Sequence, residues 1–195
     1  MAPMSAYTGS MTAPVKTRVR EEDYLATMTD EKPSLEFVNG EVFQKPVVKR
    51  SHLIVADEVL AALRDYRRRA GGVSGPEATV NFSWDADRRY RVPDVAYWAA
   101  DRPLAQENGI LLPPTVAVEI RSEGQSIDDL RDMCREYRSR GVDVCWLIDP
   151  EARIGEVFDA TRDGETVPSD GALEAEALPG FKLELPGLWH SLANS

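Results

Sequence analysis

The chain has 195 residues, 43% of them hydrophobic and 29% charged, a composition typical of a globular domain and unlike that of disordered or collagen-like chains. No apolar run approaches the roughly 18–20 residues that a membrane-spanning helix needs, so we expect no membrane segment. Acidic side chains outnumber basic ones by 33 to 23, giving a net charge of −10. The chain therefore lacks a global positive field that would attract nucleic acid, and any such function depends on a local site.

The length suits one domain with a hydrophobic core. We expect residues 1–20 to form a disordered tail and residues 21–190 to form a single domain. Cys134 and Cys145 fall in a predicted helix and a predicted strand, so we interpret them as buried thiols of a reducing compartment. The cytoplasm is the expected location.

The first half of the chain predicts a hairpin followed by a long helix. Residues 21–28 are expected to form a short helix, and residues 35–45 place two β-prone arms around Asn39-Gly40, a strong hairpin signal. From Ser51, a candidate N-cap, apolar residues recur at helical spacing as far as Gly71-Gly72. This pattern predicts a helix of about five turns.

The second half predicts three strands, a helix and a fourth strand. The β-prone stretches are residues 78–84, 91–99 and 115–122. Ser126 then caps a predicted amphipathic helix that ends near Gly141, and residues 142–150 are apolar enough for a strand covered on both faces. The expected core order is α-β-β-β-α-β, in an α/β fold with a small mixed sheet flanked by helices.

Two carboxylates on neighbouring predicted strands are the most suggestive chemical feature. Asp94 follows Pro93 in one strand, and Glu119 lies in the next, two residues before Arg121. Alternation along a strand would point Glu119 and Arg121 to one face and Ile120 into the core. Two hard oxygen ligands can share a divalent cation, and a nearby cationic side chain can stabilise phosphate charge, an arrangement that suits phosphodiester hydrolysis.

A purely structural interpretation of these residues stays open. Asp after Pro often marks a turn, and a Glu/Arg pair two residues apart on a strand is often a surface ion pair worth at most about 1 kcal/mol. The apolar neighbours of Glu119 favour a site, because an unpaired carboxylate is costly to bury.

In this order, the motifs of the chain resemble those of the Uma2 family of restriction endonucleases, a branch of the PD-(D/E)XK nuclease superfamily. The resemblance covers roughly residues 21–190. It rests on the hairpin at 35–43, His52, Pro93-Asp94, the strand at 119–122, the helix end at 137–142, the strand at 146–150 and the closing segment at 178–189.

This resemblance implies a restriction-endonuclease-like fold and a metal-dependent endonuclease that acts on DNA. It implies Mg²⁺ or Mn²⁺ held by Asp94 and Glu119, with the backbone carbonyl of Ile120 as a third ligand and Arg121 steadying the phosphate. The lysine typical of such sites would fall at Met133. An arginine does not replace it as a general base, because a guanidinium stays protonated.

Two accessory residues and a rival function remain as expectations. Glu41 is a candidate for an additional acidic group and His52 for a phosphate contact, although an exposed strand Glu and a satisfied helix-start His are the ordinary alternatives. The family resemblance also suggests a homodimer. The alternative to the enzyme is an inactive relative, impaired by Met133, that binds DNA or protein.

Overall fold

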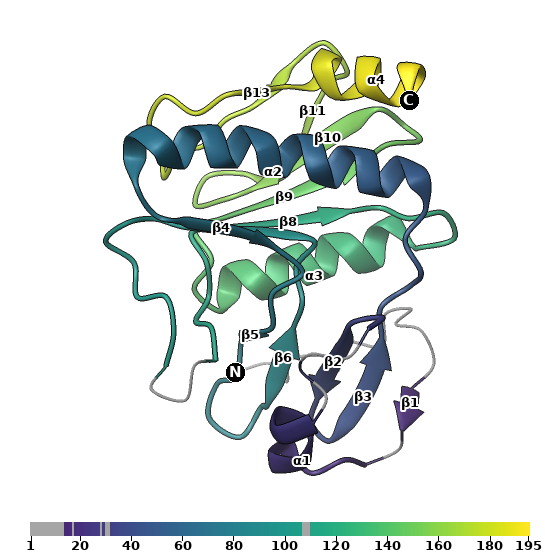
Figure 1. Cartoon of the computed structure of the whole chain (residues 1–195), viewed down its shortest axis with the longest axis vertical. Coiled ribbons are helices and arrows are strands. Elements are labelled where there is room, and N and C mark those ends of the chain that lie inside the picture. The colour runs from purple at the N-terminus through teal and green to yellow at the C-terminus, as the bar shows by residue number, and fades with distance from the viewer. Residues whose placement is uncertain (1–13, 17, 28, 30–31, 107–109) are drawn as a thin grey trace.

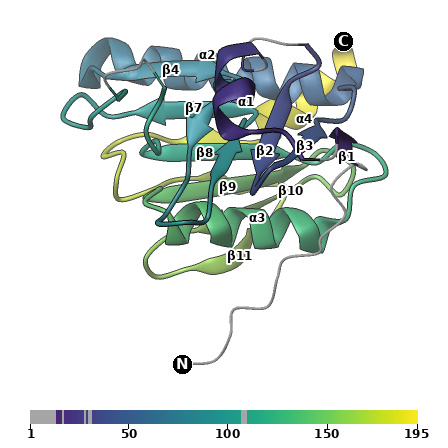
Figure 2. The same ribbon diagram turned by 90° about the horizontal axis from the view of Figure 1, so that it is seen from below.

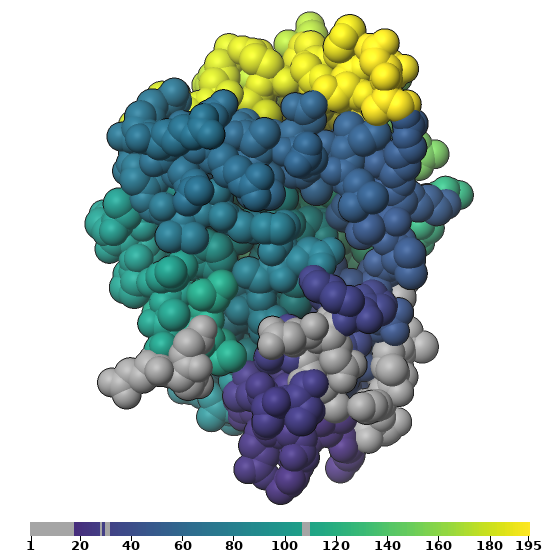
Figure 3. Space-filling model, in the orientation of Figure 1, coloured from purple at the N-terminus to yellow at the C-terminus, as the bar shows by residue number. Residues whose placement is uncertain are grey.

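Helices and two main β-sheets build the fold, which we describe from a computed structural model (Figure 1). The structure describes residues 14–16, 18–27, 29, 32–106 and 110–195. Figure 3 shows the N-terminal part and the C-terminal segment at opposite ends of the molecule. Apart from residues 14–16 and 18–20, the expected tail at 1–20 lies outside the described residues.

The smaller of the two sheets is built on the predicted hairpin. Asn39 and Gly40 both have positive φ angles, 50° and 94°, as a two-residue hairpin turn requires. Helix α1 (Glu21–Thr27) packs Tyr24 against Phe37 of this sheet, with ring centroids 5.2 Å apart. The strand order is β1-β3-β2-β6-β5, with β1 (Pro14–Lys16), β2 (Leu35–Val38), β3 (Glu41–Gln44), β5 (Val80–Asn81) and β6 (Arg89–Arg91).

The larger sheet is mixed. Its parallel pair is β8 and β9, which α3 connects, and its other neighbours are antiparallel. The strand order is β11-β10-β9-β8-β7-β4, with β4 (Val73–Pro76), β7 (Val95–Trp98), β8 (Val116–Ile120), β9 (Val144–Asp149), β10 (Ile154–Phe158) and β11 (Asp163–Val167). A short pair, β12 (Ala172–Leu173) and β13 (Leu183–Glu184), lies near the C-terminus.

Helices cover both faces of the larger sheet, as Figure 2 shows. Helix α2 (Arg50–Ala70) lies on one face, with α4 (Leu185–Asn194) packed beside it, and α3 (Ile127–Ser139) lies on the other. Alternate residues of the central strands therefore join two separate apolar cores. Ile120 belongs to the core under α2, as the alternation predicts.

The predicted α-β-β-β-α-β order and the restriction-endonuclease-like fold are confirmed, but the first strand of the core is different. Residues 78–84 were expected to form it, yet only Val80–Asn81 is a strand, and it pairs with β6 in the smaller sheet. The first strand of the core in the larger sheet is instead β4, which pairs along β7. Its glycine and proline gave no strand signal, but they are tolerated because β4 is an edge strand.

The ends of the two long helices differ in how well they were predicted. Ser126 caps α3, its hydroxyl accepting the N–H of Asp129 at 3.3 Å, as expected. Helix α2 begins at Arg50 rather than after Ser51, and its N-cap, Lys49, makes no side-chain capping bond.

Cys134 and Cys145 are free and buried. In the described part of the chain, no helix combines the length and apolarity needed to cross a bilayer.

Candidate active site

Asp94 and Glu119 face each other across two antiparallel strands. The register pairs Val95 of β7 with Val118 of β8, so the next residues, Asp94 and Glu119, are opposite one another. Both lie on the side of the sheet that α3 covers, and each is only 3% exposed. The fold thus brings together two carboxylates that the sequence separates by 25 positions.

A lysine from the hairpin joins these carboxylates. Lys45 directly follows β3, and its Nζ donates a hydrogen bond of 2.6 Å to Oδ1 of Asp94. The same Nζ lies 3.9 Å from Oε2 of Glu119. The two carboxylates therefore converge on one cationic group, whose side chain is 15% exposed.

The other oxygen of each carboxylate is occupied by a donor of the protein. Oδ2 of Asp94 accepts the backbone N–H of Ile120 at 2.7 Å. Oε1 of Glu119 accepts the hydroxyl of Tyr137, on α3, at 2.8 Å. Asp94 Oδ1 and Glu119 Oε2 are consequently the oxygen atoms that remain directed toward Lys45.

The surroundings of Asp94 and Glu119 shift the pKa values of their two carboxyl groups in opposite directions. Burial acts to raise the pKa of Asp94, but the charge of Lys45 and the hydrogen bond to His52 outweigh it and hold that pKa well below its usual range. Burial, reinforced by the nearby carboxylates Asp94 and Glu36, raises the pKa of Glu119 above its usual value. Burial acts to lower the pKa of Lys45, but Asp94 and Glu119 raise it more, so Lys45 stays an ammonium.

His52 lies at the edge of this cluster, in the first turn of α2. Its Nε2 is 3.5 Å from Oδ1 of Asp94, and its Nδ1 is 3.1 Å from the hydroxyl of Ser122. The histidine is only 5% exposed. It therefore connects Asp94 to the loop after β8, and its accessory function stays a prediction.

The buried acidic residue of the hairpin is Glu36, whereas the accessory function of Glu41 stays a prediction. Glu41 is exposed beside the turn, whereas Glu36, on β2, is 5% exposed. Glu36 accepts the N–H of Val92 at 2.9 Å and a guanidinium N–H of Arg91 at 3.0 Å. The sequence signal that could have identified Glu36 is its position inside the apolar run Leu35–Val38.

Arg121 lies just beyond the end of β8. Its guanidinium Nη1 pairs with Asp149 at 2.7 Å, and its Nε donates to the carbonyl of Gln125 at 3.1 Å. Arg121 also lines an open hollow of about 200 Å³, together with Lys49, Ser51, Ser122, Glu123, Asp149, Pro150 and Glu151. The proposed phosphate contact of Arg121 stays a prediction.

Met133 is a partly buried apolar residue of α3 that packs against the core between α3 and the larger sheet. It lies one turn before Tyr137, which bonds to Glu119. The amine that the sequence lacks at Met133 is present in the cluster because Lys45 reaches it from the hairpin. Sequence reasoning missed Lys45, Glu36 and Tyr137.

Together, the mixed sheet between helices and the acidic pair at its centre define a restriction-endonuclease-like protein. The sequence model of the family Uma2, described as "Putative restriction endonuclease", matches residues 21–192, and the chain belongs to this family.

Among solved structures, the fold is similar to the crystal structure of "a putative nuclease belonging to DUF820" from Anabaena variabilis. The two share 20% sequence identity with a TM-score of 0.74 over 87% of this chain and 97% of that chain. No curated protein matches the sequence.

Proposed function

We propose that the chain is a metal-dependent endonuclease that hydrolyses phosphodiester bonds of DNA. The observation that carries this proposal is the convergence of Asp94 Oδ1 and Glu119 Oε2 on one cationic group inside a nuclease-family fold. Two buried carboxylates that face one point repel each other, and a cation between them relieves that repulsion. Lys45 supplies that cation in the structure, and the proposed function adds a metal ion.

The chemistry of the available oxygen atoms fits Mg²⁺ or Mn²⁺. Magnesium is commonly bound by one or two carboxylates and completes its coordination with water and substrate oxygens. Within the described residues, no group of three His, Cys, Asp or Glu side chains is arranged to hold a metal ion. The ligands that we propose are the ones that the family resemblance implies: Asp94, Glu119 and the backbone carbonyl of Ile120. Such an ion would lower the pKa of a bound water and neutralise charge on the scissile phosphate.

The cationic side chains have separate functions in this proposal. Because Lys45 stays an ammonium, it acts as a hydrogen-bond donor that steadies the phosphate or the attacking water, and not as a general base. Arg121, which lines the neighbouring hollow, contacts a phosphate of the substrate. No covalent intermediate is needed.

The alternative of an inactive binding module rested on Met133 and on the net negative charge of the chain. An amine is nevertheless supplied by Lys45, which supports the enzyme over the binding module. Nicking of supercoiled plasmid DNA tests the choice. We expect the purified protein to nick it with Mn²⁺ or Mg²⁺ and to stop when excess EDTA is added. A protein that binds DNA without nicking it under any of these conditions would support the binding module instead.

A further inference from the structure

The backbone of Val92 is held on both sides by the hairpin. Its N–H donates to Oε1 of Glu36 at 2.9 Å, and its C=O accepts from Nζ of Lys45 at 2.5 Å. Val92 lies between β6 of the smaller sheet and β7 of the larger one and is 1% exposed. Buried backbone groups between two sheets need partners outside the strand ladders, and here two side chains provide them.

This arrangement bears directly on Asp94, two residues later. The ring of Pro93 fixes its φ angle and leaves it without an N–H, so Pro93 has little backbone freedom and no donor that the protein could bind. Val92 is therefore the last residue before Asp94 whose N–H can be held. Fixing its peptide helps to fix the start of β7, where the C=O of Asp94 also accepts the N–H of Glu77 at 3.2 Å and Asp94 presents Oδ1 to Lys45.

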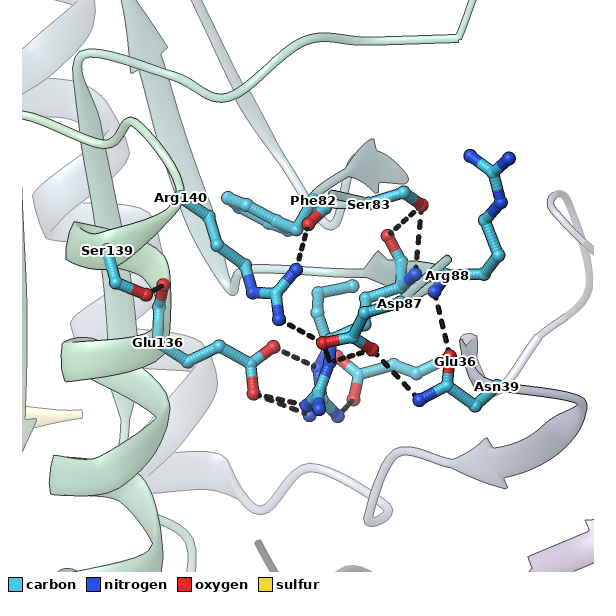
Figure 4. Close-up of polar contacts among 11 residues, drawn as sticks. Glu36, Asn39, Phe82, Ser83, Asp87, Arg88, Glu136, Ser139 and Arg140 are labelled. Carbon is cyan, nitrogen blue, oxygen red and sulfur yellow. Dashed lines mark hydrogen bonds and ion pairs between the residues drawn. The ribbon is translucent and has the colours of Figure 1, made fainter. Parts of the chain in front are cut away.

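Both oxygens of Glu36 are engaged. Oε1 accepts from Val92, and Oε2 accepts from Arg91, whose side chain is completely buried. Arg91 in turn pairs with Glu136 of α3 at 3.3 Å. Figure 4 shows Glu36 and Glu136 approaching the same group of guanidinium nitrogens from two sides. Glu36 is thus committed to the backbone and to Arg91, which argues against a role for Glu36 itself as a metal ligand.

We propose that Glu36 is a positioning residue that holds the Val92 peptide so that Asp94 is directed at the cation site. The inference rests on the proposed function of Asp94 and Glu119 as cation ligands. It makes Glu36 necessary for tight metal binding although Glu36 is not itself a metal ligand, as residues that support metal ligands commonly are.

Substitutions at Glu36 separate the hydrogen bond from the charge. In Glu36→Gln the side-chain oxygen can still accept the N–H of Val92, whereas Glu36→Met has a similar shape and no acceptor. Glu136→Gln is the matched control, because Glu136 also pairs with Arg91 but lies on α3 and makes no bond to Val92. Each variant is measured for Mn²⁺ affinity by calorimetry, for unfolding in urea, and for hydrogen exchange at the amide of Val92.

We expect Glu36→Met to weaken Mn²⁺ binding about 10-fold to 100-fold and to speed exchange at Val92. Glu36→Gln should keep much of the Mn²⁺ affinity and of the protection of the Val92 amide from exchange. Glu136→Gln should bind Mn²⁺ like the wild type even if it unfolds at a lower urea concentration. If Glu36→Met does not fold, the same Gln and Met substitutions are compared in an Arg91→Met background, which removes the buried cation.

Two results would overturn the inference. Wild-type Mn²⁺ affinity in Glu36→Met would show that Asp94 needs no support from Glu36. Equal weakening in Glu36→Met and Glu136→Gln would show that the ion network acts only through overall stability. Wild-type protein that binds no Mn²⁺ would instead contradict the proposed function, and the positioning role with it, so the two failures are distinguishable.

Discussion

The ammonium of Lys45 and the carboxylate of Asp94 form a hydrogen-bonded ion pair of 2.6 Å between residues 49 positions apart in the chain. The pair connects the hairpin to the larger sheet at the point where Glu119 also approaches. Folding of the hairpin against the sheet is therefore what completes the candidate site.

Lys45→Ala should reduce the rate of DNA cleavage about 100-fold or more, because removing one donor that stabilises transition-state charge commonly has this effect. Lys182→Ala is the control, because Lys182 lies outside the candidate site, is 53% exposed and pairs with the surface residue Glu184. Initial rates on plasmid DNA measure both. Equal rates for the two variants would remove Lys45 from the mechanism.

Neutralising the two carboxylates should change stability in opposite directions. Asp94→Asn leaves buried Lys45 without its close partner and should lower the free energy of unfolding by about 3 kcal/mol. Glu119→Gln removes a carboxyl group whose raised pKa costs stability at pH 7, and it should raise the free energy of unfolding by about 1 kcal/mol. Urea unfolding without added metal measures both, and both variants should lose cleavage.

The effect of Glu119→Gln should also depend on pH. A raised pKa in the folded state means that the carboxyl group costs stability as the pH rises from its ordinary pKa of about 4 toward the folded value. The gain from Glu119→Gln should therefore be larger at pH 8 than at pH 5. A gain that is the same at both pH values would contradict the raised pKa of Glu119.

Divalent metal should stabilise the protein through Asp94. A ligand present at about 100 times its dissociation constant stabilises the folded state by about 2.7 kcal/mol, so saturating Mn²⁺ or Mg²⁺ should raise the melting temperature. Asp94→Ala should show no such rise. An equal rise in both proteins would mean that the metal binds elsewhere.

Asp87 should contribute to stability at neutral pH and not in acid. Partial burial acts to raise its pKa, but hydrogen bonds from Arg89, Asn39 and Arg140 lower it to about 2 (Figure 4). Because this pKa is depressed, the contribution is present above about pH 4 and is lost as the pH falls toward 2. Asp87→Asn should therefore destabilise the protein at pH 7 and much less at pH 2.5. Equal destabilisation at both would refute this account.

Local patterns predicted most of the elements because their signals lie close together in the chain. The turn at Asn39-Gly40, the Ser126 cap and the apolar spacing of α2 each act over a few residues. The edge strand β4 was missed because its stability comes from pairing along β7 rather than from its own residues.

The candidate site was predictable only in part, for the same reason. Pro93-Asp94 and the strand of Glu119 gave recognisable motifs on neighbouring strands of one sheet. Lys45 and Glu36 belong to the other sheet, and the sequence does not show that the hairpin folds back against β7. Their contacts with Val92 and Asp94 depend on how the two sheets pack, which no local pattern records.

The most direct test of the central claim is metal-dependent cleavage of plasmid and oligonucleotide DNA by the wild-type protein beside Asp94→Ala and Glu119→Ala, all purified identically to control for contaminating nucleases. The account predicts cleavage with Mn²⁺ or Mg²⁺ that both substitutions abolish. Cleavage that persists unchanged in both folded variants, or its absence from a wild-type protein that binds the metal, would contradict it.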